Sequence, residues 1–154
     1  MKINFTKKEY ITLLEMVHIA GWMLHSYRTD RPPDRQAHLE LEEKILSLAK
    51  EFGCDDMVQF DQKLNAHFPT REFEDSVTPF IEEYDDDTLW AELTERLMQR
   101  DVVRAVGEEK LRTLTIEERL KAEEPHEQKY NDEFQEHGLE RLEVVSGPVA
   151  TGRN

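Results

Sequence analysis

Two motifs that start α-helices, Thr6-x-x-Glu9 and Thr115-x-x-Glu118, constrain the fold of this chain most strongly. In each motif the threonine hydroxyl and the glutamate carboxylate can bond to the other residue's backbone N–H, which satisfies donors that a helix start leaves free. Apolar residues follow both motifs at helical spacing, so each predicts a long helix. We expect the first helix to run to about Tyr27. The helix that Thr115 begins should end at Gly138, with a kink or break near Pro125.

Further stretches carry apolar residues at helical spacing or a signal that starts a helix. The second helix would span residues 34–52, with Gly53 just after its end. Its apolar residues on one face are Ala37, Leu41, Ile45, Leu48 and Phe52. The others would be a short helix within residues 55–67, one or two turns around residues 73–77, a helix that Thr78 and Pro79 begin, and a helix over residues 89–106.

Alternating polar and apolar residues predict a strand at each end of the chain. Lys2–Phe5 and Leu139–Val145 have this pattern, and two terminal strands can satisfy each other's backbone groups. We therefore predict a mainly α-helical bundle of five to seven helices, in which a small two-stranded sheet pairs the N- and C-terminal segments. Residues 1–145 would form a single helical domain, and residues 146–154 a flexible C-terminal tail. In an alternative arrangement, one of these strands pairs across a homodimer.

The composition disfavours a membrane span and excludes an internal disulfide. The longest apolar stretch, Ile11–Leu24, is interrupted by polar residues, whereas a span needs roughly 18 consecutive apolar residues. Cys54 is the one cysteine, and the opening MKINFTKKEY lacks the apolar stretch of a secretory signal. We therefore expect a cytoplasmic protein.

Negative charge is concentrated in one part of the chain. The formal net charge is −14, and residues 72–95 hold ten acidic residues with no Lys or Arg. The stretches before and after them are nearly balanced. Nucleic acids and anionic membranes bind clustered cations, so this distribution disfavours direct contact with either.

The most acidic part of this stretch reads IEEYDDDTLW at residues 81–90. We interpret Asp85–Asp87 as the start of a helix, where carboxylates cap free N–H groups and favour the positive end of the helix dipole. The surrounding acids would then form a surface with aromatic anchors that suits a basic protein partner. This hypothesis involves Glu82, Glu83, Tyr84, Asp85, Asp86, Asp87 and Trp90.

Two other interpretations of the acidic stretch compete with this one. The rings can belong to the core, with the acids as its solvated outer face. The oxygen ligands can also hold calcium or magnesium at a surface site, although the spacing does not fit an EF-hand.

A second candidate site lies on the first helix, where Glu15 and His18 are spaced as a metal-binding pair. Residues three apart face the same side of a helix, so the carboxylate and the imidazole could share one metal. His25 returns to that side, and His38 of the second helix could point towards it. We predict no cofactor, but a helical metalloprotein or metal-dependent hydrolase would need a divalent metal here. The competing interpretation treats these residues as the polar stripe of an amphipathic helix.

The sequence contains no recognised catalytic or nucleotide-binding motif. The thiol of Cys54 precedes two aspartates, whose charges oppose its reactivity. A further alternative is that regularly spaced carboxylates mimic DNA phosphates and inhibit a DNA-binding protein. We rank first a non-enzymatic interaction or accessory protein whose acidic stretch binds a basic protein surface.

Three stretches of the chain carry a resemblance. FTKKEYITLLEMVHIAGWM, TLWAELTERLMQRD and HGLERLEV resemble segments of small helical bacterial proteins of uncharacterised function. The resemblance extends over most of the chain and implies a bacterial or phage-related cytoplasmic protein, without an activity.

Overall fold

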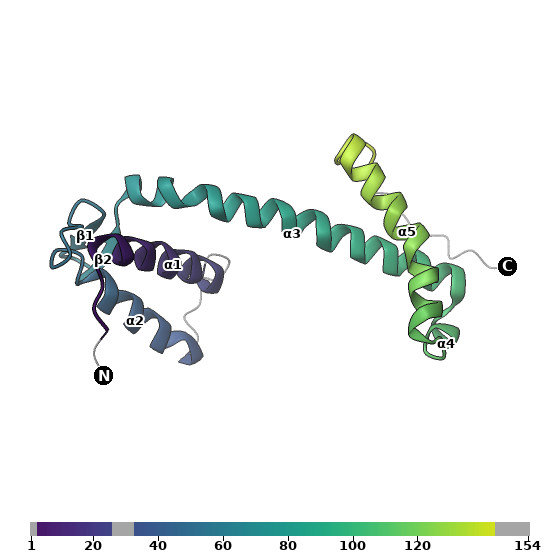
Figure 1. Cartoon of the computed structure of the whole chain (residues 1–154), viewed down its shortest axis with the longest axis horizontal. Coiled ribbons are helices and arrows are strands. Elements are labelled where there is room, and N and C mark those ends of the chain that lie inside the picture. Colours follow the sequence, from purple (N-terminus) through teal and green to yellow (C-terminus); the bar gives the residue numbers. More distant parts are fainter. Residues whose placement is uncertain (1–2, 26–32, 144–154) are drawn as a thin grey trace. The chain divides into compact units, whose positions relative to one another are not determined.

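The computed structural model describes residues 3–25 and 33–143 of the chain (Figure 1). These residues form five α-helices, one 3-10 turn and one two-stranded antiparallel sheet. Their bounds are α1 Lys7–His25, η1 Pro33–Arg35, α2 Gln36–Leu46, β1 Val58–Asp61, β2 Ala66–Pro69, α3 Arg71–Val106, α4 Glu108–Leu111 and α5 Ile116–His137. The predicted mainly helical fold with a small two-stranded sheet is confirmed, but the sheet lies elsewhere in the chain.

The chain divides into two compact units, residues 1–84 and residues 85–154. The boundary between them falls within α3, so one helix contributes residues to both units. The single domain that we expected over residues 1–145 stays a prediction, because compactness does not decide whether the units unfold together. The predicted tail, residues 146–154, lies outside the described residues.

The first capping box starts α1 as predicted. The backbone N–H of Thr6 donates to Glu9 Oε2 over 2.8 Å, and the backbone N–H of Glu9 donates to Thr6 Oγ1 over 3.3 Å. The bond from the Thr6 backbone is the main reason that the pKa of Glu9 is lowered. One turn apart on the helix that follows, Tyr10 and Leu14 are both only 1% exposed.

The core of the first unit joins α1, α2, the segment after α2, the sheet and the beginning of α3. Its buried residues are Tyr10, Leu14, Leu46, Ala49, Cys54, Val58, Phe73 and Val77. The ring of Tyr10 stacks on Phe52 with centroids 4.1 Å apart, and its hydroxyl donates to the carbonyl oxygen of Ile45. Burial raises the pKa of Tyr10 to about 12, so this hydroxyl stays a donor at neutral pH.

The second helix is shorter than predicted, and its buried face differs. α2 ends at Leu46, and the backbone N–H groups of Leu48 and Ala49 bond three residues back rather than four. This tighter winding changes the direction in which the following side chains point. Leu46 and Ala49 are buried, whereas Leu41, which we expected on the apolar face, is 57% exposed. Gly53 ends the segment at φ 67°, as its predicted cap role requires.

The helix predicted within residues 55–67 is wrong, because this segment forms a β-hairpin. Val58 pairs with Pro69 and Asp61 with Ala66. Asp61 Oδ1 accepts the backbone N–H groups of Lys63 and Leu64 over 2.7 and 3.0 Å, and Asn65 adopts φ 49°. These side-chain bonds and the left-handed residue stabilise the turn that brings the two strands together.

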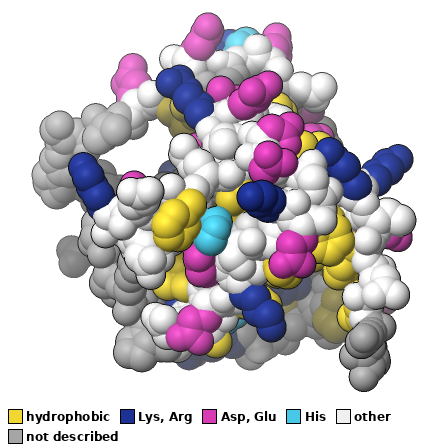
Figure 2. All heavy atoms as spheres, turned by 90° about the vertical axis from the view of Figure 1, so that its left-hand side faces the viewer, with side chains coloured by type: hydrophobic (Ala, Val, Ile, Leu, Met, Phe, Trp, Pro, Cys, Tyr) yellow, Lys and Arg dark blue, Asp and Glu magenta, His cyan; other side chains and the backbone are white. Residues whose placement is uncertain are grey.

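A polar contact fixes this hairpin to α2. His67 Nδ1 lies 2.7 Å from Glu43 Oε1, and the backbone N–H of His67 donates to Glu43 Oε2 over 2.8 Å. Figure 2 looks at the end of the first unit where the hairpin lies, and there acidic and basic side chains are interspersed with hydrophobic ones.

The sheet does not pair the ends of the chain in the part that the structure describes. Residues 3–6 are not in a strand, and residues 138–141 form turns. The remaining predicted strand residues, Lys2, Val144 and Val145, lie outside the described residues. A hairpin closes a loop of only a few residues, whereas joining the termini requires the much larger entropy loss of closing almost the whole chain.

In the second unit, α5 packs against the C-terminal part of α3. Its capping box is present, because Thr115 Oγ1 accepts the N–H of Glu118 and Glu118 Oε2 accepts the N–H of Thr115. Tyr130 and Phe134 of α5 are buried, as are Thr94 and Val102 of α3. The predicted break at Pro125 is wrong, since α5 runs through it to the expected cap at Gly138.

None of the helices in residues 3–25 and 33–143 combines the length and the hydropathy of a membrane-spanning segment.

Substitution of two leucines, one buried and one exposed, tests the packing described for the first unit. We expect Leu14→Ala to lower the free energy of unfolding by about 2–5 kcal/mol, because Leu14 is 1% exposed and its removal leaves a cavity. The matched change Leu41→Ala, on α2, should alter it by less than about 0.5 kcal/mol. Urea unfolding followed by circular dichroism measures both, and equal losses would contradict the burial described for α1 and α2.

Candidate functional site

The three aspartates at residues 85–87 lie in the middle of a helix and not at its start. α3 begins at Arg71, after Thr70, whose Oγ1 accepts the N–H of Phe73 over 3.4 Å. Glu72 and Glu74 in the first turn supply the acidic groups that favour a helix start. The predicted start at Asp85–Asp87 is therefore wrong, although Leu89–Val106 is helical as expected.

The start predicted at Thr78 and Pro79 is also wrong, because both residues lie inside α3. Thr78 Oγ1 donates to the carbonyl oxygen of Glu74 over 2.9 Å, one turn earlier in the same helix. Val77 and Ile81 on either side of the proline are 0% and 8% exposed. Their burial offsets the roughly 3 kcal/mol that an interior proline costs a helix.

Consecutive residues of an α-helix point about 100° apart, so Asp85, Asp86 and Asp87 diverge from one another. Three diverging carboxylates cannot surround one ion. Consistent with this, the described residues contain no group of three or more His, Cys, Asp or Glu side chains arranged to hold a metal. The same divergence spreads the acids of α3 around the helix instead of lining them up in one regular row.

Most carboxylates of residues 72–95 face solvent. Asp85 is half-buried and the other nine are exposed. Within the described part of the chain, six of them make no hydrogen bond or ion pair with another side chain: Glu72, Glu74, Glu82, Glu83, Asp85 and Asp87. The nearest bases in the sequence, Arg71 and Arg96, pair with Asp75 at 3.9 Å and with Glu92 at 2.8 Å. No basic side chain of the described residues therefore pairs with the centre of the acidic stretch.

The structure separates the aromatic and aliphatic residues of this stretch into buried and exposed sets. Phe73, Val77 and Ile81 belong to the core of the first unit, as the competing interpretation held. Phe80 and Tyr84 are 58% and 52% exposed, and their spacing of four residues places them in one row.

Two of the free carboxylates, Glu83 and Asp87, form the neighbouring row of the same helix, because each lies three residues after one of these rings. We call Phe80, Glu83, Tyr84 and Asp87 the acidic–aromatic surface.

Trp90 is part of the packing of the second unit. Its ring lies 5.4 Å from that of Phe134, centroid to centroid, and its Nε1–H donates to Asp86 Oδ1 over 3.1 Å. It also lines a pocket with Thr94 and Phe134 between α3 and α5. Unlike Tyr84, this predicted anchor is already engaged within the chain.

The predicted metal ligands do not come together in the described structure. His18 is half-buried and meets Phe73 edge-on, with ring centroids 5.9 Å apart. Burial lowers its pKa, and the charge of Glu74 partly opposes that change. His25 Nε2 is buried with no hydrogen-bond partner in the described chain, Glu15 is half-buried, and His38 is exposed on α2. His18 therefore serves as a packing residue between α1 and α3.

Cys54 is fully buried in the core of the first unit. Burial is the main cause of the raised pKa of its thiol, and Asp55 and Asp56 raise it further, as the sequence indicated. Both effects disfavour the reactive thiolate.

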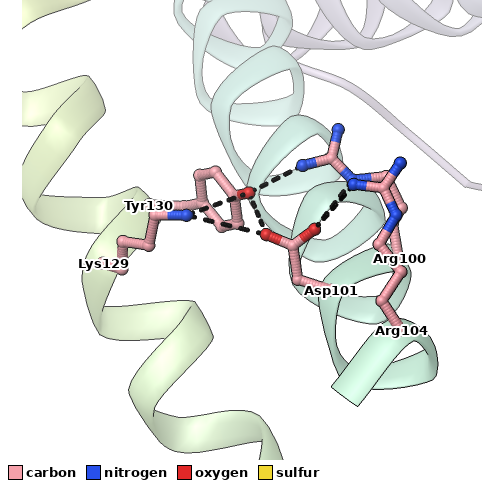
Figure 3. A network of polar contacts seen from close by, with 5 residues as sticks. All are labelled: Arg100, Asp101, Arg104, Lys129 and Tyr130. Atoms are coloured by element: carbon pink, nitrogen blue, oxygen red, sulfur yellow. Dashed lines mark hydrogen bonds and ion pairs between the residues drawn. The ribbon is translucent and has the colours of Figure 1, made fainter. Parts of the chain in front are cut away.

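A polar network that sequence analysis missed joins α3 to α5 in the second unit (Figure 3). The hydroxyl of Tyr130 donates to Asp101 Oδ2 and accepts a bond from Arg100 Nη2 over 2.8 Å. Arg100 Nε donates to Asp101 Oδ1 over 2.9 Å, and Arg104 and Lys129 lie 3.4 and 3.6 Å from the same carboxylate. Of these five residues, only the three within α3, at residues 100, 101 and 104, lie close enough in the sequence for an interaction to be predicted from their spacing.

This network holds the pKa of Asp101 well below its ordinary value of 3.8. The bond from Arg100 is the largest cause, and burial of the carboxyl group opposes it. The side chain of Asp101 is 15% exposed, so solvent screens these interactions only in part. The arrangement gathers three cations around one carboxylate and links α3 to α5.

No family model matches this chain, and no curated protein or solved structure matches it either.

The acidic middle of α3 should be the weakest part of that helix. Glu83 lies three and four residues before Asp86 and Asp87, and each such like-charge pair destabilises a helix by about 0.2–0.5 kcal/mol. We expect Glu83→Gln to slow amide hydrogen exchange over residues 83–91 at low salt. At high salt the variant and the wild type should become equal, because screening removes the repulsion. Slower exchange that persists unchanged at high salt would contradict an electrostatic origin.

The Asp101 network predicts a pH dependence of stability. A carboxyl group whose pKa is lowered in the folded state adds stability above its unfolded pKa, and this stability is lost as the pH falls through the folded pKa. We expect Asp101→Asn to lower the free energy of unfolding at pH 7 by about 1–3 kcal/mol and to flatten its decline below pH 4. The control Asp132→Asn removes an exposed carboxylate of α5 and should change the free energy at pH 7 by less than about 0.5 kcal/mol. Denaturant unfolding at several pH values measures all three proteins.

Proposed function

We propose that this protein is a non-enzymatic interaction or accessory protein whose acidic stretch on α3, residues 72–95, binds a basic surface of another protein. The observation that carries the proposal is the acidic–aromatic surface. Its two carboxylates, Glu83 and Asp87, have no side-chain partner in the described chain, and its two rings are more than half exposed. A cytoplasmic setting is part of the same proposal.

Charge and rings would contribute in different ways. Unpaired carboxylates attract a cationic surface over several ångströms and speed its encounter, while exposed aromatic side chains supply contact area once the surfaces meet. A basic partner would also remove the repulsion among the acids of α3, so that binding and helix stability reinforce each other.

The partner that fits best has an apolar row beside a basic row. The rings at residues 80 and 84 and the carboxylates at residues 83 and 87 follow the same four-residue spacing along α3. An amphipathic helix with Lys or Arg at that spacing would place its cations against the carboxylates and its apolar side chains against the rings.

Two double variants separate these contributions. Glu83→Gln with Asp87→Asn removes charge and keeps shape, while Phe80→Ala with Tyr84→Ala removes the rings. Proteins that bind the immobilised wild type should bind either variant at least about tenfold more weakly, and salt should weaken wild-type binding much more than binding to the charge variant. Titration with each purified partner, by calorimetry at low and high salt, measures these affinities.

A matched control removes two charges elsewhere. Glu124→Gln with Glu127→Gln changes two exposed carboxylates of α5 and should leave the affinity within about twofold of the wild type. An affinity that is independent of salt, or an equal loss in the control, would refute the proposed role of the acidic–aromatic surface.

A further inference from the structure

One face of α3 carries a charge pattern that is complementary to itself. The residues that form it recur at alternating spacings of four and three, which is the spacing that keeps side chains on one side of paired helices. In chain order they are Asp86, Leu89, Leu93 and Arg96. The face therefore reads acid, leucine, leucine, arginine, and we call it the α3 seam.

The α3 seam lies away from the residues through which α3 packs in the second unit. Thr94 is 7% exposed, and its neighbour Leu93 points about 100° away from it. Leu89 at the centre of the seam is 49% exposed, and the side chain of Arg96 is 76% exposed. Leu89 and Leu93 thus form an apolar contact point with charged groups of opposite sign on either side.

We propose that the α3 seam binds the α3 seam of a second copy of the chain, with the two helices antiparallel. A two-fold axis between Leu89 and Leu93 would place each of these leucines against the other one in the partner. Asp86 would then face the partner's Arg96. Every contact occurs twice, as in a closed symmetric dimer.

The order of charges selects both the orientation and the occupant. Parallel helices would place acid against acid and arginine against arginine, which is repulsive. A uniformly basic partner would meet Arg96 unfavourably, whereas a second copy matches all four positions. Arg96 can keep its bond to Glu92, because a guanidinium group has five N–H donors.

This pairing does not rest on the proposed function, because the α3 seam and the acidic–aromatic surface have no residue in common. The contact is short and its ion pairs are partly solvated, so we expect a dimer that dissociates on dilution and at high salt.

Charge reversal tests the pairing directly in the full-length chain. Sedimentation velocity of the wild type at rising concentration and low salt should show the mass increase from 18.2 kDa towards double that value. Arg96→Glu and Asp86→Arg should each raise the dimer dissociation constant at least about tenfold, because each places like charges opposite each other at two positions. The double variant Asp86→Arg with Arg96→Glu exchanges both charges and should dimerise again.

Mixing the two single variants gives a sharper outcome. The Arg96→Glu chain then presents acids at both residues 86 and 96, and the Asp86→Arg chain presents arginines at both. The mixture should therefore form heterodimers, although each variant alone dimerises only weakly. This recovery also shows that the single variants are folded. The control Arg112→Glu, an exposed charge reversal away from the seam, should leave the dissociation constant within about twofold. A wild type that stays monomeric at millimolar concentration, a mixture that does not associate, or dimers that are insensitive to Arg96→Glu would overturn the proposal.

Discussion

The burial of apolar side chains at two places along α3 holds the acidic middle of that helix in a helical conformation. Phe73, Val77 and Ile81 are buried in the first unit, and Val102 in the second. Each fully buried large side chain contributes about 1.5–3 kcal/mol, whereas a like-charge pair one turn apart costs only a few tenths of a kcal/mol. Tertiary packing therefore outweighs both the repulsion and the interior proline, and the carboxylates are displayed on a regular scaffold.

This balance explains why the sequence predicted the start of α3 at the wrong place. Asp85–Asp87 have the composition of a helix start, and Thr78-Pro79 has its form, so local rules favour a break at each. Thr6 and Thr115 were placed correctly because each capping box satisfies two donors and agrees with the apolar pattern that follows it. At residues 78–87 the local signals conflict with the burial of residues on both sides, and burial depends on contacts that a single sequence does not display.

The remaining differences have the same origin in contacts between distant residues. A helix was predicted in place of the hairpin because Phe60 and Leu64 have helical spacing. These two side chains are 50% and 67% exposed, so their spacing does not mark the buried face of a helix. The Asp101 network depends on Tyr130, which no local pattern links to residue 101. The acidic stretch itself was evident from composition. Its division into exposed rings and buried ones could not be predicted, because it depends on which side of α3 the rest of the first unit covers.

The geometry of one helix also allows two surfaces in a single stretch of sequence. Asp86 and Asp87 are neighbours in the chain but point about 100° apart, so Asp86 lies on the α3 seam and Asp87 on the acidic–aromatic surface. The seam combines an arginine with an acid, which is why we propose a second copy as its partner. The acidic–aromatic surface contains no cation, which is why we propose a basic partner for it. A run of aspartates that cannot converge on a metal can, for the same geometric reason, face two different protein partners.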